Sequence, residues 1–329
     1  MASFSQFGND LYTGKRSYDI VGRRRIWYSV AAVLILAAVV IPILRGGFIF
    51  GIEFRGGSQF QVSNTTNLSQ PFAGDTVTKV VANANPRVSV VGGNSVRIQT
   101  DQLSDAQSVK IQEALASAYN VPVKSVTASF IGATWGQDIT RQALTGLVIF
   151  VVLAAIVMAL YFRTWKMSLA ALVALLHDLI ITAGFYGIFG IEVTPAAVIG
   201  FLTILGYSLY DTVVVFDKIR ENTSEDGAES RRTFGESVNL AVNQTLVRSI
   251  NTSIVAILPV GAILFIGALV LGAGTLRDIS LALFVGIIAG TYSTIFIAAP
   301  LYAHLRSGEE AIKKRDKRTN AVRQASVTS

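Results

Sequence analysis

The sequence predicts a polytopic α-helical membrane protein, with six transmembrane helices and a small α+β domain between the first and second spans. The first observation is composition: of the 329 residues, 51% are hydrophobic and only 15% are charged. The second is that the apolar residues form blocks of about 20 residues, the length that a helix needs to cross a bilayer. These blocks are Ile26–Leu44, Gln142–Phe162, Met167–Ile191, Val193–Phe216, Ser249–Ala273 and Ile279–Ala303.

The distribution of Lys and Arg predicts the orientation of these spans. With the N-terminus inside, the cytoplasmic segments carry 19 of the 28 basic residues, and most of the others lie in one long loop, where the positive-inside rule has little weight. We therefore expect both termini to be cytoplasmic, with residues 1–25 as the N-terminal segment. The first block is long enough to span and shows no small-residue cleavage site, so we expect it to be retained.

Composition also bears on the kinds of site that the chain can hold. The absence of cysteine excludes disulfides and thiolate metal sites, and two histidines are too few for a histidine-rich metal centre. We expect no metal, no cofactor and no catalytic site. The net charge of +7 lies mainly on the cytoplasmic segments, where anionic lipids are the expected partner, and nothing in it requires a nucleic acid.

Residues 46–140 are expected to form an extracytoplasmic folded domain. Alternating stretches predict strands, helical spacing predicts two helices, and Gly92-Gly93-Asn94 predicts a hairpin turn. The elements are Ser58–Ser63, Asp75–Asn83, Arg87–Val91, Ser95–Gln99, Ser104–Tyr119 and Val123–Phe130. This strand–helix–strand–strand–helix–strand order predicts a ferredoxin-like unit. It is neutral, with six basic and six acidic residues, and it shows no catalytic motif, so we expect a binding or lever domain.

The other five spans are expected to form a transmembrane domain over residues 142–303, with a long cytoplasmic loop at 217–248. The first part of that loop, Glu221–Glu229, is polar and is expected to be mobile. The second part, Phe234–Leu246, is expected to be an amphipathic helix that leads into the fifth span. The tail at 304–329 is basic and expected to be cytoplasmic, and beyond Ser307 it is polar and expected to be disordered.

Asp211 is the only charged residue between Val193 and Phe216. An ionised carboxylate inside a bilayer costs at least ~2.5 kcal/mol, so it needs a partner, a proton or a function. We expect it to face a neighbouring helix in the cytoplasmic half of the bilayer, because its helical face carries mostly small residues that permit close packing. These residues are Ala197, Gly200, Ile204, Tyr207 and Ser208.

Arg248 is the expected partner of Asp211, because it lies at the cytoplasmic end of the fifth span at a similar depth. Two interpretations are open. A static ion pair would lock two helices together, whereas a carboxylate that alternates between protonated and ionised forms would release and recapture the arginine. The second interpretation, which we favour, couples proton passage to helix movement.

His177 and Asp178 are a second polar pair inside a predicted span. An imidazole beside a carboxylate can relay protons near neutral pH, which would place both in the proton pathway. A hydrogen-bonded pair that only holds helices together explains the sequence equally well. In the sixth span, "GTYSTIF" (residues 290–296) places small and hydroxyl-bearing residues on one face, which helix packing explains better than a water path.

The motif "GIEFRGG" runs from Gly51 to Gly57, directly after the first span. The paired glycines Gly56 and Gly57 allow positive φ and a tight turn from helix into sheet. We expect this motif to be a joint that orients the folded domain, with Glu53 and Arg55 as local charges.

Together these motifs resemble the SecF family of protein-export membrane subunits, over residues 20–305. "GIEFRGG" is similar to the family signature Gly-Ile-Asp-Phe-Thr-Gly-Gly, and "HDLIITAGFYGIFGIEVTP" (177–195) resembles its third span and the loop that follows. "GYSLYDTVVVFDKIREN" (206–222) is close to a 17-residue family signature. That signature begins with Gly-Tyr-Ser, which corresponds to Gly206, Tyr207 and Ser208 in this chain. "QTLVRSINTS" (244–253) and "GTYSTIFIAAPL" (290–301) match the fifth- and sixth-span signatures.

The resemblance implies assistance to protein export by the proton motive force at the bacterial inner, or plasma, membrane. The implied partners are SecD, the SecYEG channel and the unfolded exported preprotein, and the implied architecture is half of an RND transporter. Asp211 and Arg248 match the family's proton-pathway residues. Three departures from the family pattern are Tyr210 in place of Asn, Glu53 in place of Asp and Arg55 in place of Thr.

Two other functions are compatible with the same spans. A stand-alone RND-like exporter of small molecules or lipids would also couple transport to protons, but a neutral domain of about 95 residues has little room for a substrate pocket. A passive scaffold for the channel would leave the buried Asp211 without a use.

Overall fold

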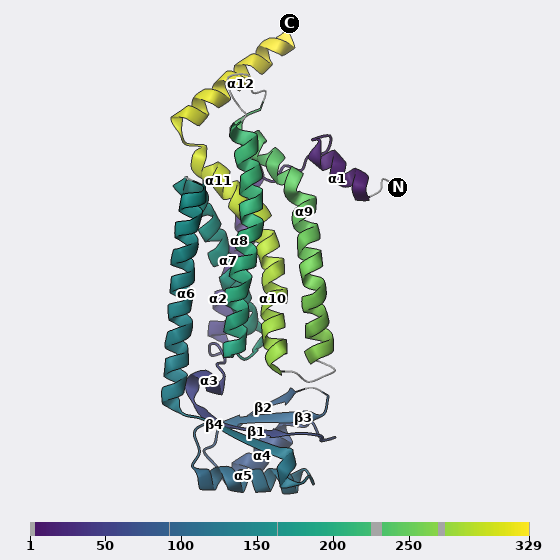
Figure 1. Ribbon diagram of the computed structural model, residues 1–329, viewed down its shortest axis with the longest axis vertical. Coiled ribbons are helices and arrows are strands. Elements are labelled where there is room, and N and C mark those ends of the chain that lie inside the picture. The colour runs from purple at the N-terminus through teal and green to yellow at the C-terminus, as the bar shows by residue number, and fades with distance from the viewer. Residues whose placement is uncertain (1–3, 92, 163, 225–231, 269–273, 329) are drawn as a thin grey trace.

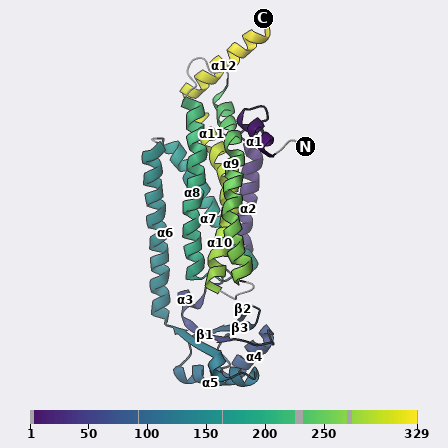
Figure 2. The same cartoon turned by 45° about the vertical axis from the view of Figure 1, so that its right-hand side comes forward.

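The computed structural model describes residues 4–91, 93–162, 164–224, 232–268 and 274–328. Long helices form an upright bundle with a small sheet at one end, and both ends of the chain lie at the other end (Figure 1). One helix, α6 (Ala133–Phe162), stands at the edge of the bundle in both views (Figure 1, Figure 2). Part of the predicted mobile loop, Glu221–Glu229, lies outside the described residues.

The described residues contain six helices that are long and apolar enough to cross a membrane, which confirms a multi-pass membrane protein. Besides α6, they are α2 (Arg24–Leu44), α7 (Trp165–Phe189), α8 (Pro195–Ser224), α9 (Phe234–Ala262, continued by a π-helical segment, Ile263–Ala268) and α10 (Gly274–Ser293, continued by a π-helical segment, Thr294–Ala298, and by α11, Ala299–Arg306). The predicted end of the fifth span, Ala273, lies outside the described residues.

Helix α9 joins the predicted amphipathic helix and the fifth span into one continuous element. It begins at a capping box, in which Thr233 Oγ1 accepts from the backbone N–H of Glu236 and the Glu236 carboxylate accepts from the backbone N–H of Thr233. This pairing satisfies two backbone donors that a helix N-terminus otherwise leaves free. The long helix therefore extends beyond the apolar block at the end of the bundle that holds both chain termini (Figure 1).

The sheet unit (residues 57–131) holds four strands and two helices in the predicted order. These are β1 (Gly57–Val62), α4 (Gln70–Val80), β2 (Arg87–Val91), β3 (Ser95–Thr100), α5 (Asp105–Ala118) and β4 (Val126–Ile131). The strands pair antiparallel in the order β2-β3-β1-β4. Phe60 pairs with Ile98 of β3 and with Ala128 of β4, and the completely buried Phe60, Ile98, Ile111 and Leu115 form the core between sheet and helices.

The predicted joint between the bundle and the sheet unit is confirmed as a turn of unusual backbone. A short helix, α3 (Ile52–Arg55), is followed by Gly56 with φ 78° and Gly57 with φ 144°, conformations that side-chain-bearing residues rarely adopt. The chain before α3 also pairs with the connection between α7 and α8. Gly51 N donates to Val193 O at 3.0 Å, and Val193 N donates to Ile49 O at 2.7 Å.

The basic tail is helical in the structure, so the expectation of disorder there is wrong. Helix α12 (Glu310–Thr328) is tied to the start of α9, because Asp316 Oδ1 accepts from Phe234 N at 2.8 Å and Arg323 forms an ion pair with Glu236 at 2.7 Å. The tail contains no Pro or Gly beyond Gly308, and residues such as Ala, Lys, Arg and Gln favour helix.

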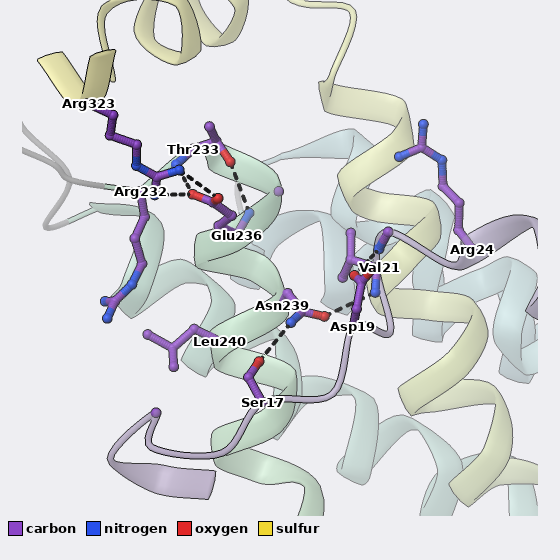
Figure 3. A pocket seen from close by; sticks show the side chains of 13 residues that line it. Ser17, Asp19, Val21, Arg24, Arg232, Thr233, Glu236, Asn239, Leu240 and Arg323 are labelled. Carbon is purple, nitrogen blue, oxygen red and sulfur yellow. Dashed lines mark hydrogen bonds and ion pairs between the residues drawn. The ribbon is translucent and has the colours of Figure 1, made fainter. Parts of the chain in front are cut away.

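The chain's N-terminal segment is also tied to α9, beyond helix α1 (Phe4–Tyr12). Asn239 Oδ1 accepts from the backbone N–H groups of Ile20 and Val21 at 2.9 and 3.1 Å, and Asn243 Oδ1 accepts from Tyr18 N at 2.8 Å. Figure 3 shows Asn239 with its bonds to Ser17 and Val21 beside the Arg323–Glu236 pair, around a cavity of about 480 Å³. Both ends of the chain are therefore anchored on one helix.

The helices of the bundle approach closely at glycines. A Cβ on Gly184 of α7 would overlap Ala38 of α2, and a Cβ on Gly286 of α10 would overlap Ile204 of α8. Small residues at these crossings let the helix backbones come together, as is typical inside a membrane. The second of these crossings brings α8 and α10, which both carry buried polar side chains, close together.

Candidate functional site

One face of α8 carries four polar side chains near its middle: Tyr207, Ser208, Asp211 and Thr212. Residues three and four positions apart lie on the same face of a helix. Ser208, Asp211 and Thr212 are at most 5% exposed, as a residue facing neighbouring helices should be. The predicted orientation of Asp211 toward the bundle interior is confirmed.

The Asp211 carboxylate makes one hydrogen bond. Its Oδ1 accepts from Ser249 Oγ of α9 at 2.9 Å. Its Oδ2 is buried and has no hydrogen-bond partner among the described residues. A buried carboxylate oxygen without a donor strongly disfavours the ionised form of the group, so this arrangement suits a carboxyl group that binds a proton.

Arg248 does not contact Asp211, so the predicted ion pair is wrong for this structure. Within the described residues no acidic group lies within 4 Å of the Arg248 guanidinium, and Arg248 is exposed. Successive residues of a helix are turned by about 100° from one another. Ser249 faces α8 at the depth predicted for Arg248, so the sequence identified the right turn of α9 but the wrong side of the helix.

His177 and Asp178 form a buried cluster that joins three helices. His177 Nδ1 lies 3.1 Å from Asp178 Oδ1, and Asp178 is 0% exposed. Asp178 Oδ2 accepts from Ser208 Oγ of α8 and from Ser293 Oγ of α10, the latter at 2.8 Å. His177 Nε2 is buried without a partner among the described residues.

The Asp178 cluster supports both open interpretations of this pair. Two serine donors fix Asp178 and lock α7, α8 and α10 together, as a structural pair would. The unpartnered His177 Nε2 is a site that could give or take a proton, as a relay would. Ser208 lies one turn from Asp211, so α8 brings the two carboxylates into one polar interior.

Hydroxyl groups extend this interior across α9 and α10. Ser253 Oγ shares a hydrogen bond with Thr291 Oγ1, and the Tyr207 hydroxyl lies 3.5 Å from Ser253 Oγ. Thr212 Oγ1 and Thr294 Oγ1 are 2.9 Å apart. The small face predicted for the sixth span is therefore a packed contact that also carries hydroxyl partners for α8 and α9.

Sequence reasoning missed the hydroxyl partners, above all Ser249. A signal was present, because Ser249 and Ser253 are four residues apart on a face of α9 that also buries Thr245. The remaining motif residues lie apart from this interior. Four of them lie at the joint with the sheet unit: Gly51, Glu53, Gly56 and Gly57. A Cβ placed on Gly206 would have no described neighbour within 4 Å, and Tyr210 is 57% exposed.

The arrangement offers oxygen atoms and one imidazole, which can hold and pass protons. In the described part of the chain no three His, Cys, Asp or Glu side chains gather as they would around a metal ion. Asp211, held by the hydroxyl of Ser249, is the buried carboxyl group of this interior that could bind a proton.

Comparison with known proteins adds to this geometry. Residues 110–308 match the family model described as "Protein export membrane protein SecD/SecF, C-terminal". The chain is 45% identical over 324 residues to a protein translocase subunit SecF of Streptomyces coelicolor, covering 98% of this chain and 86% of that one. It is 41% identical to a protein translocase subunit SecF of Mycobacterium tuberculosis, covering 95% and 72%.

A solved structure is also similar. The crystal structure of SecDF, a translocon-associated membrane protein from Thermus thermophilus, superimposes with a TM-score of 0.77 at 28% identity. The match covers 89% of this chain and 39% of that chain. This chain therefore corresponds to one part of the longer SecDF polypeptide of Thermus thermophilus.

Proposed function

We infer the function from one premise: this chain belongs to the SecD/SecF family of protein export membrane proteins. We propose that it is the SecF-type auxiliary subunit of a Sec protein translocase. In this role it uses the proton gradient across the bacterial plasma membrane to assist the passage of preproteins. Its relatives carry the name of translocase subunit over nearly its whole length.

The observation that carries the coupling to protons is the buried Asp211 carboxyl group. One of its oxygens has no donor among the described residues, and the other is held by Ser249. The static ion pair would require Arg248 in contact with Asp211, and Arg248 does not make that contact. Proton binding relieves the cost of the buried charge, and proton release restores it, so the group alternates between two states that helices α8 and α9 can follow.

The proposed topology places the sheet unit outside the cell and both termini in the cytoplasm. The excess of Lys and Arg at the end of the bundle that holds both termini supports it. We take the sheet unit to be a ferredoxin-like lever domain, because its strand order is β2-β3-β1-β4 and α4 and α5 lie on one side of the sheet (Figure 1). The domain bounds proposed are 46–140 for this unit and 142–303 for the five-helix transmembrane part.

The proposed partners are SecD, the SecYEG channel and the unfolded preprotein. The match to about two fifths of SecDF supports SecD as the other half of an RND-like whole. The proton pathway would run through Asp211, with Arg248 acting by its charge, and His177 and Asp178 in a relay or a structural role. Anionic lipids would bind the basic cytoplasmic segments.

A stand-alone exporter of small molecules has less support. The relatives are named as translocase subunits, and the folded unit between the first two spans is small and filled by its own core. The family is one of accessory translocase subunits, and we propose no enzymatic reaction for this chain.

The decisive experiment is Asp211→Asn in inverted membrane vesicles that also contain SecD and the channel. Secretion of a reporter preprotein is measured with and without an uncoupler, at matched protein level. Asn keeps the shape of the side chain and its bond to Ser249 but cannot exchange a proton, so the uncoupler-sensitive part of export should fall at least tenfold. The variant should accumulate as well as the unmodified chain.

Asp217→Asn is the matched control, because it makes the same change six residues further along α8. Asp217 accepts a hydrogen bond from Tyr161 at 2.7 Å at the end of the bundle, outside the polar interior. In the Asp217→Asn variant, the gradient-stimulated part of export should be unchanged. Stimulation that survives in Asp211→Asn would refute the proton-carrier role, and a defect of equal size with and without the uncoupler would point to a lock.

A further inference from the structure

The junction between the sheet unit and the bundle holds charged groups that the proposed proton site does not use. A cavity of about 1010 Å³ lies there, bordered by β2, β3, the linker after α2, the connection between α7 and α8, and the start of α10. Its lining includes Arg97 of β3, Glu192 of the connection, and Arg277 and Asp278 of α10. These charges meet where the sheet unit rests on the bundle.

Two carboxyl groups converge on one glycine beside this cavity. A Cβ built on Gly51 would overlap Glu53 Oε2 and would lie 3.3 Å from Glu192 Oε1. Both oxygens are buried, and neither has a hydrogen-bond partner among the described residues. Glu53 belongs to α3, whereas Glu192 directly precedes Val193, which pairs with the linker, so the two groups bridge the joint itself.

The charges around this pair do not neutralise it by contact. Within the described residues no ion pair shorter than 4 Å joins Arg97 or Arg277 to Glu53, Glu192 or Asp278. Arg97 Nε is itself buried without a partner in the described part of the chain. Two ionised carboxylates this close, without a bonded cation, repel each other.

Some of the neighbouring groups raise the pKa of the Glu192 carboxyl group and others lower it. Burial raises the pKa of the Glu192 carboxyl group, and the negative charges of Glu53 and Asp278 raise it further, while Gln99 and Arg97 oppose the rise. Asp278 is held in place, since its Oδ2 accepts from Thr194 Oγ1 at 2.8 Å. Arg45 and Arg87 also line the cavity, and Arg45 donates to the backbone oxygen of Ile188. Arg55 of α3 is exposed and donates to the backbone oxygen of Phe50.

We propose that Glu53 and Glu192 form an acid pair that binds one proton and thereby holds the sheet unit on the bundle. With the proton on Glu192, its O–H can donate to Glu53, and the joint is closed. Loss of that proton leaves two negative charges at Gly51, which push α3 away from the connection between α7 and α8. This inference rests on the proposed function in one respect: the proposed topology places the pair on the side of the membrane that supplies protons.

The sign of the pH dependence follows from the direction of the pKa shift. A carboxyl group whose pKa is raised by docking stabilises the docked state most below the ordinary glutamate pKa of 4.5. This contribution is lost as the pH rises through the raised value. Acidity on that side therefore favours the closed joint, and a more alkaline medium favours an open one.

The test uses the absence of cysteine in this chain, which allows two engineered cysteines to be labelled cleanly. Leu44 at the end of α2 is 80% exposed, and Ser117 of α5 is exposed, so both accept a spin label. Their distance distribution is measured in lipid nanodiscs by pulsed electron paramagnetic resonance between pH 4.5 and 8.5. A single narrow distance at low pH should broaden or lengthen as the pH rises.

Three variants make the result specific. Glu192→Gln mimics the protonated group and should keep the narrow distance at every pH, while Glu53→Gln removes the repulsion and should reduce the change. Glu113→Gln, an exposed carboxyl group on α5, should leave the pH transition unchanged. A distance independent of pH in the unmodified chain, or an effect of Glu113→Gln equal to that of Glu192→Gln, would overturn the proposal. Because no export is measured, its failure is separate from a failure of the proposed function.

Discussion

Replacing Asp178 by Ala should destabilise the bundle far more than replacing Asp211 by Asn. Asp178 is 0% exposed and has three polar neighbours: His177 Nδ1, Ser208 Oγ and Ser293 Oγ. Alanine leaves His177 Nδ1 and Ser208 Oγ without their partner in a buried place, whereas Ser293 Oγ keeps the backbone oxygen of Gly290 as an acceptor. It also removes the contact that ties α7 to α8 and α10.

The magnitude can be worked from these three contacts. Hydrogen bonds between membrane helices average about 0.6 kcal/mol each, so the two bonds from Ser208 and Ser293 set a lower figure of about 1 kcal/mol for Asp178→Ala. Buried polar groups left unsatisfied cost about 1–3 kcal/mol each, so the loss at His177 Nδ1 and Ser208 Oγ raises the figure to about 6 kcal/mol if the site cannot rearrange. A loss in this range is a large part of the stability of a typical domain.

The assay is thermal unfolding in detergent, followed by the fraction of chain that stays monodisperse. Thr203→Ala is the matched control: Thr203 also lies on α8, but its hydroxyl bonds only to its own helix at Ile199 O and it is exposed. Asp178→Asn keeps an oxygen for the serine donors but cannot exchange a proton, so loss of gradient-stimulated export at an unchanged melting temperature would favour the relay over the structural pair. A melting temperature of Asp178→Ala equal to that of Thr203→Ala would refute the reasoning.

Three further predictions follow from the packing and the charges. Gly184→Leu should lower the stability of the bundle by about 1–3 kcal/mol or more, and should lower the amount of protein in the membrane, because the new side chain would overlap Ala38. Gly206→Ala has open space around it, so an immunoblot of the membranes should show as much of this variant as of the unmodified chain. Burial acts to raise the pKa of Glu309, but Arg306 and Lys166 hold it below its ordinary value. The ion pairs of Glu309 with these two cations should therefore be fully formed above pH 4.5 and should be lost as the pH falls further. A spin label on α12 should then become more mobile, and a label whose mobility does not change on acidification would contradict this. Arg248→Lys should retain most of the gradient-stimulated export and Arg248→Glu should lose it, because an exposed Arg248 can act on the site only by its charge; equal export by the two variants would exclude that role.

The sheet unit illustrates how local patterns can predict a fold. Strands β2 and β3 begin at the predicted residues, and Ser104 caps α5 in a capping box with Gln107, as a Ser before an apolar-periodic stretch suggests. Period-two alternation and turn residues are properties of neighbouring residues, so they can be seen in one sequence. The order of the elements followed from these local signals.

The error over Arg248 has a different origin. Two residues at similar depth on two helices can meet only if both helices have the right rotation about their axes, and a turn of 100° separates Arg248 from Ser249. That rotation is set by close packing at glycines and small residues between helices, which no local pattern encodes. The helical tail was missed for a related reason, because Asp316 and Arg323 find their partners on α9 only once the bundle has formed.

By itself the sequence determined that the chain crosses a membrane, how many spans it has, where a folded unit is inserted, and that Asp211 is buried in a helix that must accommodate it. These properties depend on the free energy of placing each segment in lipid or water, which is a sum over nearby residues. Only the tertiary structure decided that Ser249 is the partner of Asp211, that Asp178 joins three helices, and that Glu53 and Glu192 meet at Gly51. Such contacts join residues far apart in the chain, and they depend on distances and rotations that exist only after the helices have packed together.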